Sequence, residues 1–135
     1  MFKEQVDNLN KNWKYRYDKE QFHTYEYWTI LKEAPYEGDC EDYSLTLLYN
    51  INNKSMKGFW KDILTFKAKM RFCRVGGQGH AVLQYDNMYI DNIQQKWTTR
   101  EALEEKGYEF TRIPYTPIEV FARLYFLGRI KWQLK

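Results

Sequence analysis

The sequence is short of cysteine, histidine and proline: its 135 residues include two Cys, two His and three Pro. Two cysteines are too few for the disulfide framework of a small secreted domain. No apolar run approaches the ~20 residues that a membrane-spanning helix needs, and the polar start MFKEQVDNLNKNWK lacks the apolar core of a signal peptide. We therefore expect a cytoplasmic protein with reduced thiols that does not associate with membranes.

The sequence also lacks a large excess of charge of one sign, because 21 Lys and Arg are nearly balanced by 18 Asp and Glu, for a net charge of +3. The basic residues are scattered, so the footprint of a nucleic-acid-binding protein is missing. The length predicts one domain over residues 1–135 with a single modest core. Aromatic residues are abundant at 19%. We expect most of them to pack in that core, with a peptide-binding groove as the alternative. We expect a monomer.

Apolar periodicity predicts helices and strands in an order typical of an α+β fold with an antiparallel sheet. The expected helices span residues 4–17, 39–52, 98–106 and 116–127. The expected strands span residues 65–75, 80–85, 88–93 and 108–113. Residues 65–75 alternate in polarity, which predicts one buried face that includes Phe66 and Phe72. Thr98 and Thr116, each followed by Glu three residues later, predict helix starts.

Cys40 lies in the segment GDCED, where the helical pattern of residues 39–52 begins. Asp39 is a good N-cap residue, which makes Cys40 the first helical residue. A thiol there faces unpaired backbone N–H groups and the positive end of the helix dipole, which both favour the reactive thiolate. A structural cysteine normally has apolar neighbours, whereas Cys40 has acids on both sides. We therefore interpret Cys40 as a nucleophile and Cys73 as an inert core thiol.

Asp39, Glu41 and Asp42 surround this thiol with negative charge, which opposes formation of the thiolate. Clustered carboxylates are also the oxygen ligands that Ca²⁺ prefers. These three residues are thus candidates for a calcium site. The alternative, equally compatible with the sequence, is that they only cap the helix.

His80 opens the predicted strand HAVLQY, and Asp91 lies in the predicted return strand MYIDNI. If the hairpin turns at Asp86-Asn87, Val82 pairs with Asp91, and His80 lies diagonally across from Asp91 on the same face. A carboxylate that orients an imidazole is what a Cys–His catalyst requires. The alternative is a surface histidine near a solvated carboxylate.

Together these residues resemble a known family. The pattern of Trp28, GDCEDY at 38–43, HAVL at 80–83 and IDN at 90–92 is similar to that of the bacterial transglutaminase-like cysteine proteinases, within the papain-like and transglutaminase superfamily. The resemblance covers about residues 25–95. The chain is shorter than the best-known members, and short relatives rich in Lys, Asn and Tyr are expected to include phage-encoded proteins.

The resemblance implies a helix-and-sheet core with the nucleophile at a helix start. It implies a triad of Cys40, His80 and Asp91 that forms a thioester with a protein or peptide substrate. The best-known members are periplasmic proteases that cleave adhesins and bind calcium through acids beside the cysteine, here Asp39, Glu41 and Asp42. For the oxyanion, the backbone N–H of Cys40 is one candidate donor and Trp28 a second, although Trp28 is equally well explained by core packing.

Three functions fit these residues. The first is a cysteine peptidase or amide hydrolase that requires no cofactor for its chemistry. The second is a transglutaminase or protein deamidase that uses the same triad. The third is a non-catalytic module that binds a peptide or protein at the former active site.

Overall fold

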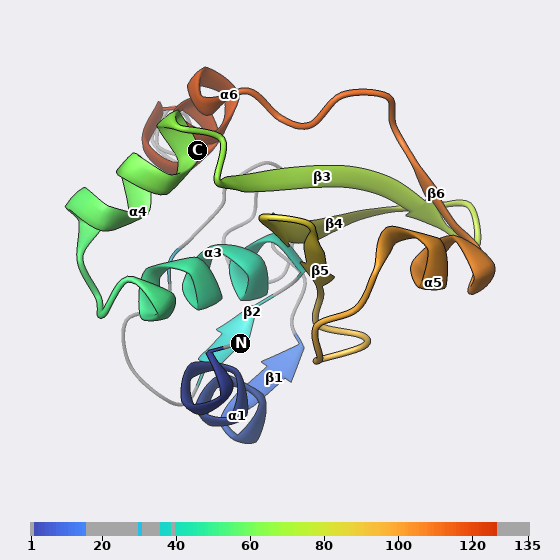
Figure 1. The fold of residues 1–135 in the computed structure, drawn as a ribbon, viewed down its shortest axis with the longest axis horizontal. Coiled ribbons are helices and arrows are strands. Elements are labelled where there is room, and N and C mark those ends of the chain that lie inside the picture. Colours follow the sequence, from blue (N-terminus) through green and yellow to red (C-terminus); the bar gives the residue numbers. More distant parts are fainter. Residues whose placement is uncertain (1, 16–29, 31–35, 39, 127–135) are drawn as a thin grey trace, which may run out of the picture.

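The computed structural model describes residues 2–15, 30, 36–38 and 40–126. The helices are α1 (Lys3–Lys11), α3 (Cys40–Ile51), α4 (Met56–Leu64), α5 (Arg100–Glu105) and α6 (Pro117–Phe121), which continues as a π-helix over Ala122–Phe126. The strands are β1 (Trp13–Tyr15), β2 (Tyr36–Gly38), β3 (Ala68–Val75), β4 (Gln78–Tyr85), β5 (Met88–Ile90) and β6 (Tyr108–Phe110). Helices and strands are thus combined in one fold (Figure 1).

The main sheet has four strands in the order β5-β4-β3-β6, and every neighbouring pair is antiparallel. The predicted α+β class and antiparallel sheet are therefore confirmed. A separate parallel pair, β1 with β2, lies beside α1 and was not predicted. Parallel pairing joins segments that are distant in the sequence, and the period-2 pattern of two three-residue strands is too short to recognise.

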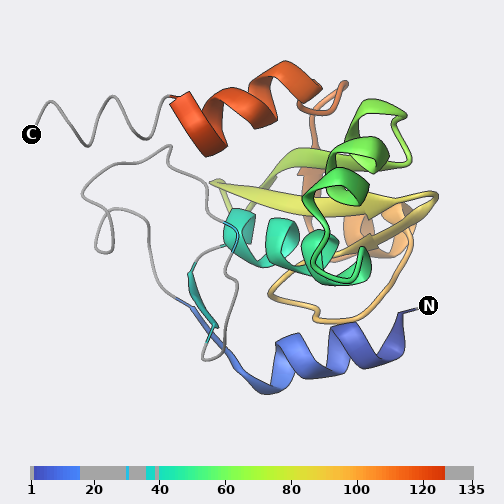
Figure 2. The same cartoon turned by 90° about the vertical axis from the view of Figure 1, so that its left-hand side faces the viewer.

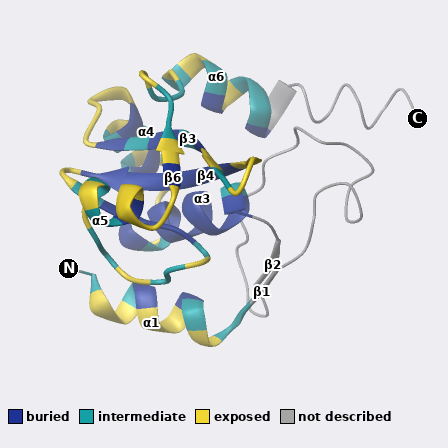
Figure 3. Ribbon diagram, turned by 90° about the vertical axis from the view of Figure 1, so that its right-hand side faces the viewer, coloured by how far each residue is buried: buried dark blue, intermediate teal, exposed yellow. Residues whose placement is uncertain are grey.

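Helix α3 lies between the sheet and α1, as Figures 1 and 2 show from two directions. It is buried on every side: all of its residues from Asp42 to Tyr49 are buried. Figure 3 shows the contrast with α1 and α5, which carry exposed residues on their outer faces. A helix covered on all sides presents its first turn to the interior, and this position is what places Cys40 next to the sheet.

Apolar residues cover both faces of the main sheet. On the α3 side, Met70 and Leu83 belong to the larger core cluster. On the opposite side, Cys73, Val82 and Tyr108 belong to a second cluster beneath α5. This second cluster includes Tyr108, which contacts both His80 and Asp91.

The first predicted helix is wrong at residues 12–15, and residues 16–17 lie outside the described residues. Residues 4–17 have apolar residues at helical spacing, but the chain leaves the helix at Asn12 and Trp13–Tyr15 form β1. The ring of Trp13 packs edge-on against Tyr43, with centroids 5.1 Å apart, so tertiary packing overrides the local period here. Helix α4 was not predicted, although Ser55 caps it by accepting a hydrogen bond from the Gly58 N–H at 3.2 Å.

The predicted strand at 65–75 begins only at Ala68, and its burial does not follow a strict alternation. Phe66, expected in the core, is 56% exposed, because its left-handed backbone (φ 62°) directs the chain out of α4. Phe72 is only partly buried, whereas Arg71 and Cys73 are buried. The second cluster covers the face that the polarity pattern assigned to solvent.

The predicted hairpin has the expected register, since Tyr85 pairs with Met88 and Asp86 takes a left-handed turn conformation. Strand β5 is shorter than predicted and ends at Ile90, so Asp91 directly follows it. The predicted strand at 108–113 likewise ends at Phe110.

Two helix starts were predicted from capping patterns. The capping box of Thr116 and Glu119 is confirmed. The cap of α5 is Thr99, not Thr98, because the backbone of Thr98 forms a bridge with Tyr89 through two 2.8 Å hydrogen bonds. Among the described residues, no helix has the length and apolar character needed to span a membrane.

Candidate active site

Cys40 is the first residue of α3, and its side chain is 7% exposed. The backbone N–H of Ala81 on β4 donates to Cys40 Sγ at 3.4 Å. The thiol donates in turn to Glu41 Oε2 at 3.3 Å. A helix start and a backbone N–H both stabilise a negative sulfur, while the neighbouring carboxylate opposes it. The helix therefore brings the thiol to the residue that directly follows His80.

His80 on β4 and Asp91 after β5 are in contact, with 2.7 Å between His80 Nε2 and Asp91 Oδ2. Their side chains are 8% and 0% exposed. An ionised carboxylate only accepts hydrogen bonds, so Nε2 carries a proton and Nδ1 of the neutral ring is a proton acceptor. The structure thus brings these two residues together, as the hairpin register predicted.

Asp91 has two further hydrogen-bond donors. The backbone N–H of Gln94 donates to Oδ1 at 2.7 Å, and the hydroxyl of Tyr108 donates to Oδ2, the oxygen that faces His80. Sequence reasoning singled out neither residue. Tyr108 reaches the site because β6 pairs with β3. The sequence of a three-residue strand is too short to predict which strand it pairs with. The bond to Gln94 is local, because Asp side chains often accept from backbone N–H groups that follow them in turns.

A cavity of about 330 Å³ joins the thiol and the imidazole. Its lining residues are Cys40, Val75, Gln78, Gly79, His80, Asn92 and Ile93. Within the described part of the chain, this lining contains apolar and amide side chains and no carboxylate, Lys or Arg. The cavity places the amide side chains of Gln78 and Asn92 near the thiol and the imidazole.

Cys73 lies directly across from His80 in the pairing of β3 with β4, and it is fully buried. Burial, with a smaller contribution from the negative charge of Asp91, raises the pKa of the Cys73 thiol to about 12. Cys73 does not line the cavity. These properties match the inert core thiol expected from the sequence.

The acids around Cys40 have different surroundings. Glu41 accepts the thiol hydrogen bond, Asp42 is fully buried, and Asp39 lies outside the described residues. Among the described residues, no three His, Cys, Asp or Glu side chains are grouped as ligands of a metal ion. Calcium binding by Asp39, Glu41 and Asp42 stays a prediction. Trp28, the predicted oxyanion donor, also lies outside the described residues.

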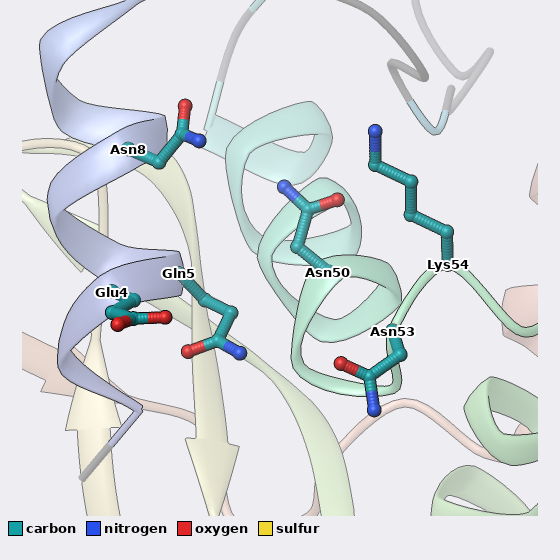
Figure 4. A pocket seen from close by; sticks show the side chains of 6 residues that line it. All are labelled: Glu4, Gln5, Asn8, Asn50, Asn53 and Lys54. Carbon is teal, nitrogen blue, oxygen red and sulfur yellow. The ribbon is translucent and has the colours of Figure 1, made fainter.

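A second, polar cleft lies between α1 and the end of α3 (Figure 4). Its lining comprises Glu4, Gln5, Asn8, Asn50, Asn53 and Lys54. The cavity at Cys40 is the better candidate for chemistry, because a thiol and an imidazole both line it.

No protein-family model matches this chain, and no curated protein matches it. The resemblance to transglutaminase-like proteinases therefore rests on the motif residues alone.

Proposed function

We propose that this protein is a cysteine hydrolase that cleaves amides through a thioester on Cys40. The observation that carries the proposal is the shared cavity, which both His80 and Cys40 at a helix start line. Asp91 contacts the imidazole at Nε2 and so orients it. A nucleophile, a base and a group that orients the base are the three parts that thiol catalysis needs.

In the structure the Cys40 thiol donates a hydrogen bond to Glu41. The first step of the proposed reaction is transfer of this proton from the thiol to His80 Nδ1. Asp91 stabilises the resulting imidazolium through Nε2, while the helix start and the Ala81 N–H stabilise the thiolate. The resulting ion pair is the reactive form of the enzyme.

In acylation, the thiolate attacks the amide carbonyl carbon and forms a C–S bond. The carbonyl oxygen becomes an oxyanion, for which the backbone N–H of Cys40 is a proposed donor. The imidazolium then gives its proton to the amide nitrogen, the C–N bond breaks, and the amine leaves. The product is a thioester on Cys40 and a neutral His80.

In deacylation, neutral His80 takes a proton from water, and the hydroxide attacks the thioester carbonyl. The C–S bond breaks, the carboxylic acid product is released, and the proton returns to the sulfur. Attack by a primary amine in place of water gives transamidation. Hydrolysis of a side-chain carboxamide gives deamidation. The transglutaminase and deamidase alternatives thus use the same groups.

The proposal extends to the fold family. A buried helix with a thiol at its start, packed on an antiparallel sheet that supplies a His–Asp pair, supports a papain-like or transglutaminase-like core. Fold-level analogy alone does not define chemistry. The residues of the site carry the functional proposal.

The proposal is tested with p-nitrophenyl acetate, an acyl donor that requires no knowledge of the substrate. We expect a burst of p-nitrophenol and an acetyl group on Cys40, found by peptide mass spectrometry. Cys40→Ala should lose the burst, while the control Cys73→Ala should keep it. An equal burst in Cys40→Ala, or acetylation only at lysines, would show that the site is a binding module or a folded relic.

A second experiment separates the three reactions. Dimethylated casein is incubated with the protein, with and without a primary amine such as monodansylcadaverine. Shorter peptides indicate a peptidase, a gain of about one dalton indicates a deamidase, and a fluorescent adduct indicates a transferase; all three rest on the same acyl-enzyme chemistry. Cys40→Ala is the control for each product.

A further inference from the structure

Tyr108 contacts both members of the His80–Asp91 pair. Its hydroxyl donates to Asp91 Oδ2, the same oxygen that lies 2.7 Å from His80 Nε2. Its ring packs edge-on against the imidazole, with centroids 5.7 Å apart and an interplanar angle of 79°. One side chain therefore restrains the carboxylate and the ring that the carboxylate orients.

Tyr108 is itself held in place. It is 3% exposed, it begins β6, and it pairs with Val75 of β3, which lines the cavity. The amide nitrogen of Gln94 lies 3.5 Å from its hydroxyl, and Lys106 Nζ donates to Gln94 Oε1 at 3.1 Å. A chain of polar contacts thus leads from the protein surface to the carboxylate.

We propose that Tyr108 is a positioning residue that sets the basicity of His80 by sharing the charge of Asp91. The inference rests on the proposed function, since His80 is the base of that reaction. A hydroxyl that donates to Oδ2 withdraws part of the negative charge that the imidazole would otherwise receive. His80 is then a moderate base, which can take the thiol proton and also release it to the leaving amine.

The hydroxyl keeps its proton across the working pH range. Burial, and next the hydrogen bond to Asp91, raise the pKa of Tyr108 well above its ordinary value. The titratable groups around the His80–Asp91 pair are Cys40 and Tyr43 from α3, Cys73 from β3 and Tyr108 from β6. Burial also raises the pKa of Tyr43 and Cys73.

The test is an NMR titration of the His80 imidazole in the full chain. Only two histidines are present, so a His80→Gln variant assigns the signal. In Tyr108→Phe the whole charge of Asp91 acts on the imidazole, and we expect its titration midpoint to rise by about half a pH unit or more. Tyr89→Phe is the matched control, because Tyr89 is a buried tyrosine of the same cluster. That variant should leave the midpoint unchanged.

A second variant keeps the hydroxyl and removes any doubt about folding. Replacement of Tyr108 by 3-fluorotyrosine makes the phenol a stronger donor, so the midpoint should fall. Opposite shifts in the two variants support the proposal. Equal midpoints in wild type, Tyr108→Phe and the fluorinated protein, or an equal shift in Tyr89→Phe, would overturn it. The failure of the proposed function is a separate observation, namely a wild-type protein that is not acylated at Cys40.

Discussion

The two cysteines of this protein are both buried and both adjacent to β4, yet their surroundings differ. Cys73 lies on β3 opposite His80, is enclosed by the second core cluster, and has a pKa raised to about 12. Cys40 lies at the start of α3, receives a backbone N–H from Ala81, and lines a cavity with His80. Proximity to a histidine is thus common to both thiols.

The difference between them lies in what stabilises a negative sulfur and what can reach it. At Cys73, burial and the charge of Asp91 both oppose ionisation. At Cys40, the helix start and the Ala81 N–H favour it, and the thiol lines a cavity. The degree of burial does not separate the structural thiol from the proposed nucleophile in this fold.

Asp91 raises the pKa of Cys73, and in the proposed reaction it assists Cys40 through His80, so Asp91→Asn has the largest expected effect. It should slow acylation of Cys40 about 100- to 1,000-fold, because an amide favours the wrong imidazole tautomer. It should also lower the pH at which Cys73 reacts, because one of the two causes of its raised pKa is removed. Stopped-flow kinetics with p-nitrophenyl acetate measures the first effect.

The control for this variant is Asp86→Asn, an exposed hairpin residue whose left-handed conformation asparagine also adopts. It should leave both thiols unchanged. If Asp86→Asn and Asp91→Asn slowed acylation equally, the carboxylate at position 91 would have no special relation to His80.

Substitution by serine should destabilise the protein more at position 73 than at position 40. Cys73→Ser places a hydroxyl in an apolar, fully buried site, at an expected cost of about 1–3 kcal/mol. Cys40→Ser retains the Ala81 N–H as a partner for its oxygen, so its cost should be smaller. Urea denaturation followed by circular dichroism gives both values. A larger loss at position 40 would contradict the proposed roles.

The raised pKa of the Cys73 thiol should affect how the stability of the protein depends on pH. Its folded pKa of about 12 lies above the value of an unfolded thiol, so the unfolded state loses its proton first as the pH rises. The free energy of unfolding should then fall above about pH 8.5, by at most about 1.4 kcal/mol per pH unit from this group. Cys73→Ala should remove this part of the decline. Urea titrations at pH 7, 8.5, 9.5 and 10.5 compare the two proteins, and parallel curves would argue against the assignment.

Glu41→Gln should have the smallest effect. The Glu41 carboxylate accepts the thiol hydrogen bond and opposes formation of the thiolate. Its neutral replacement should raise the alkylation rate of Cys40 at pH 7 about two- to fivefold. Glu105→Gln, an exposed carboxylate on α5, is the control and should change nothing. A slower reaction in Glu41→Gln would instead assign the carboxylate a role in activating the thiol.

The sequence predicted the parts of the site that depend on local geometry. The helix start at Cys40 follows from the GDCED segment, and the contact between His80 and Asp91 follows from the hairpin register. Both features depend on residues that are near one another in the sequence.

Features that depend on contacts across the fold were missed. The reach of Tyr108 to Asp91 arises from the pairing of β3 with β6, two strands separated by a hairpin and α5. The strand at Trp13 was read as helix, because its packing against Tyr43 is a tertiary contact. Local periodicity carries no information about such partners.

The most direct test of the account is the alkylation rate of each cysteine in one folded sample. The protein is treated with iodoacetamide between pH 6 and 9, and peptide mass spectrometry reads Cys40 and Cys73 separately. We predict that Cys40 reacts about 100-fold faster than Cys73 or more at pH 7, and that the two rates become similar in urea. Equal rates in the folded protein, or faster labelling of Cys73, would contradict the assignment of Cys40 as the nucleophile.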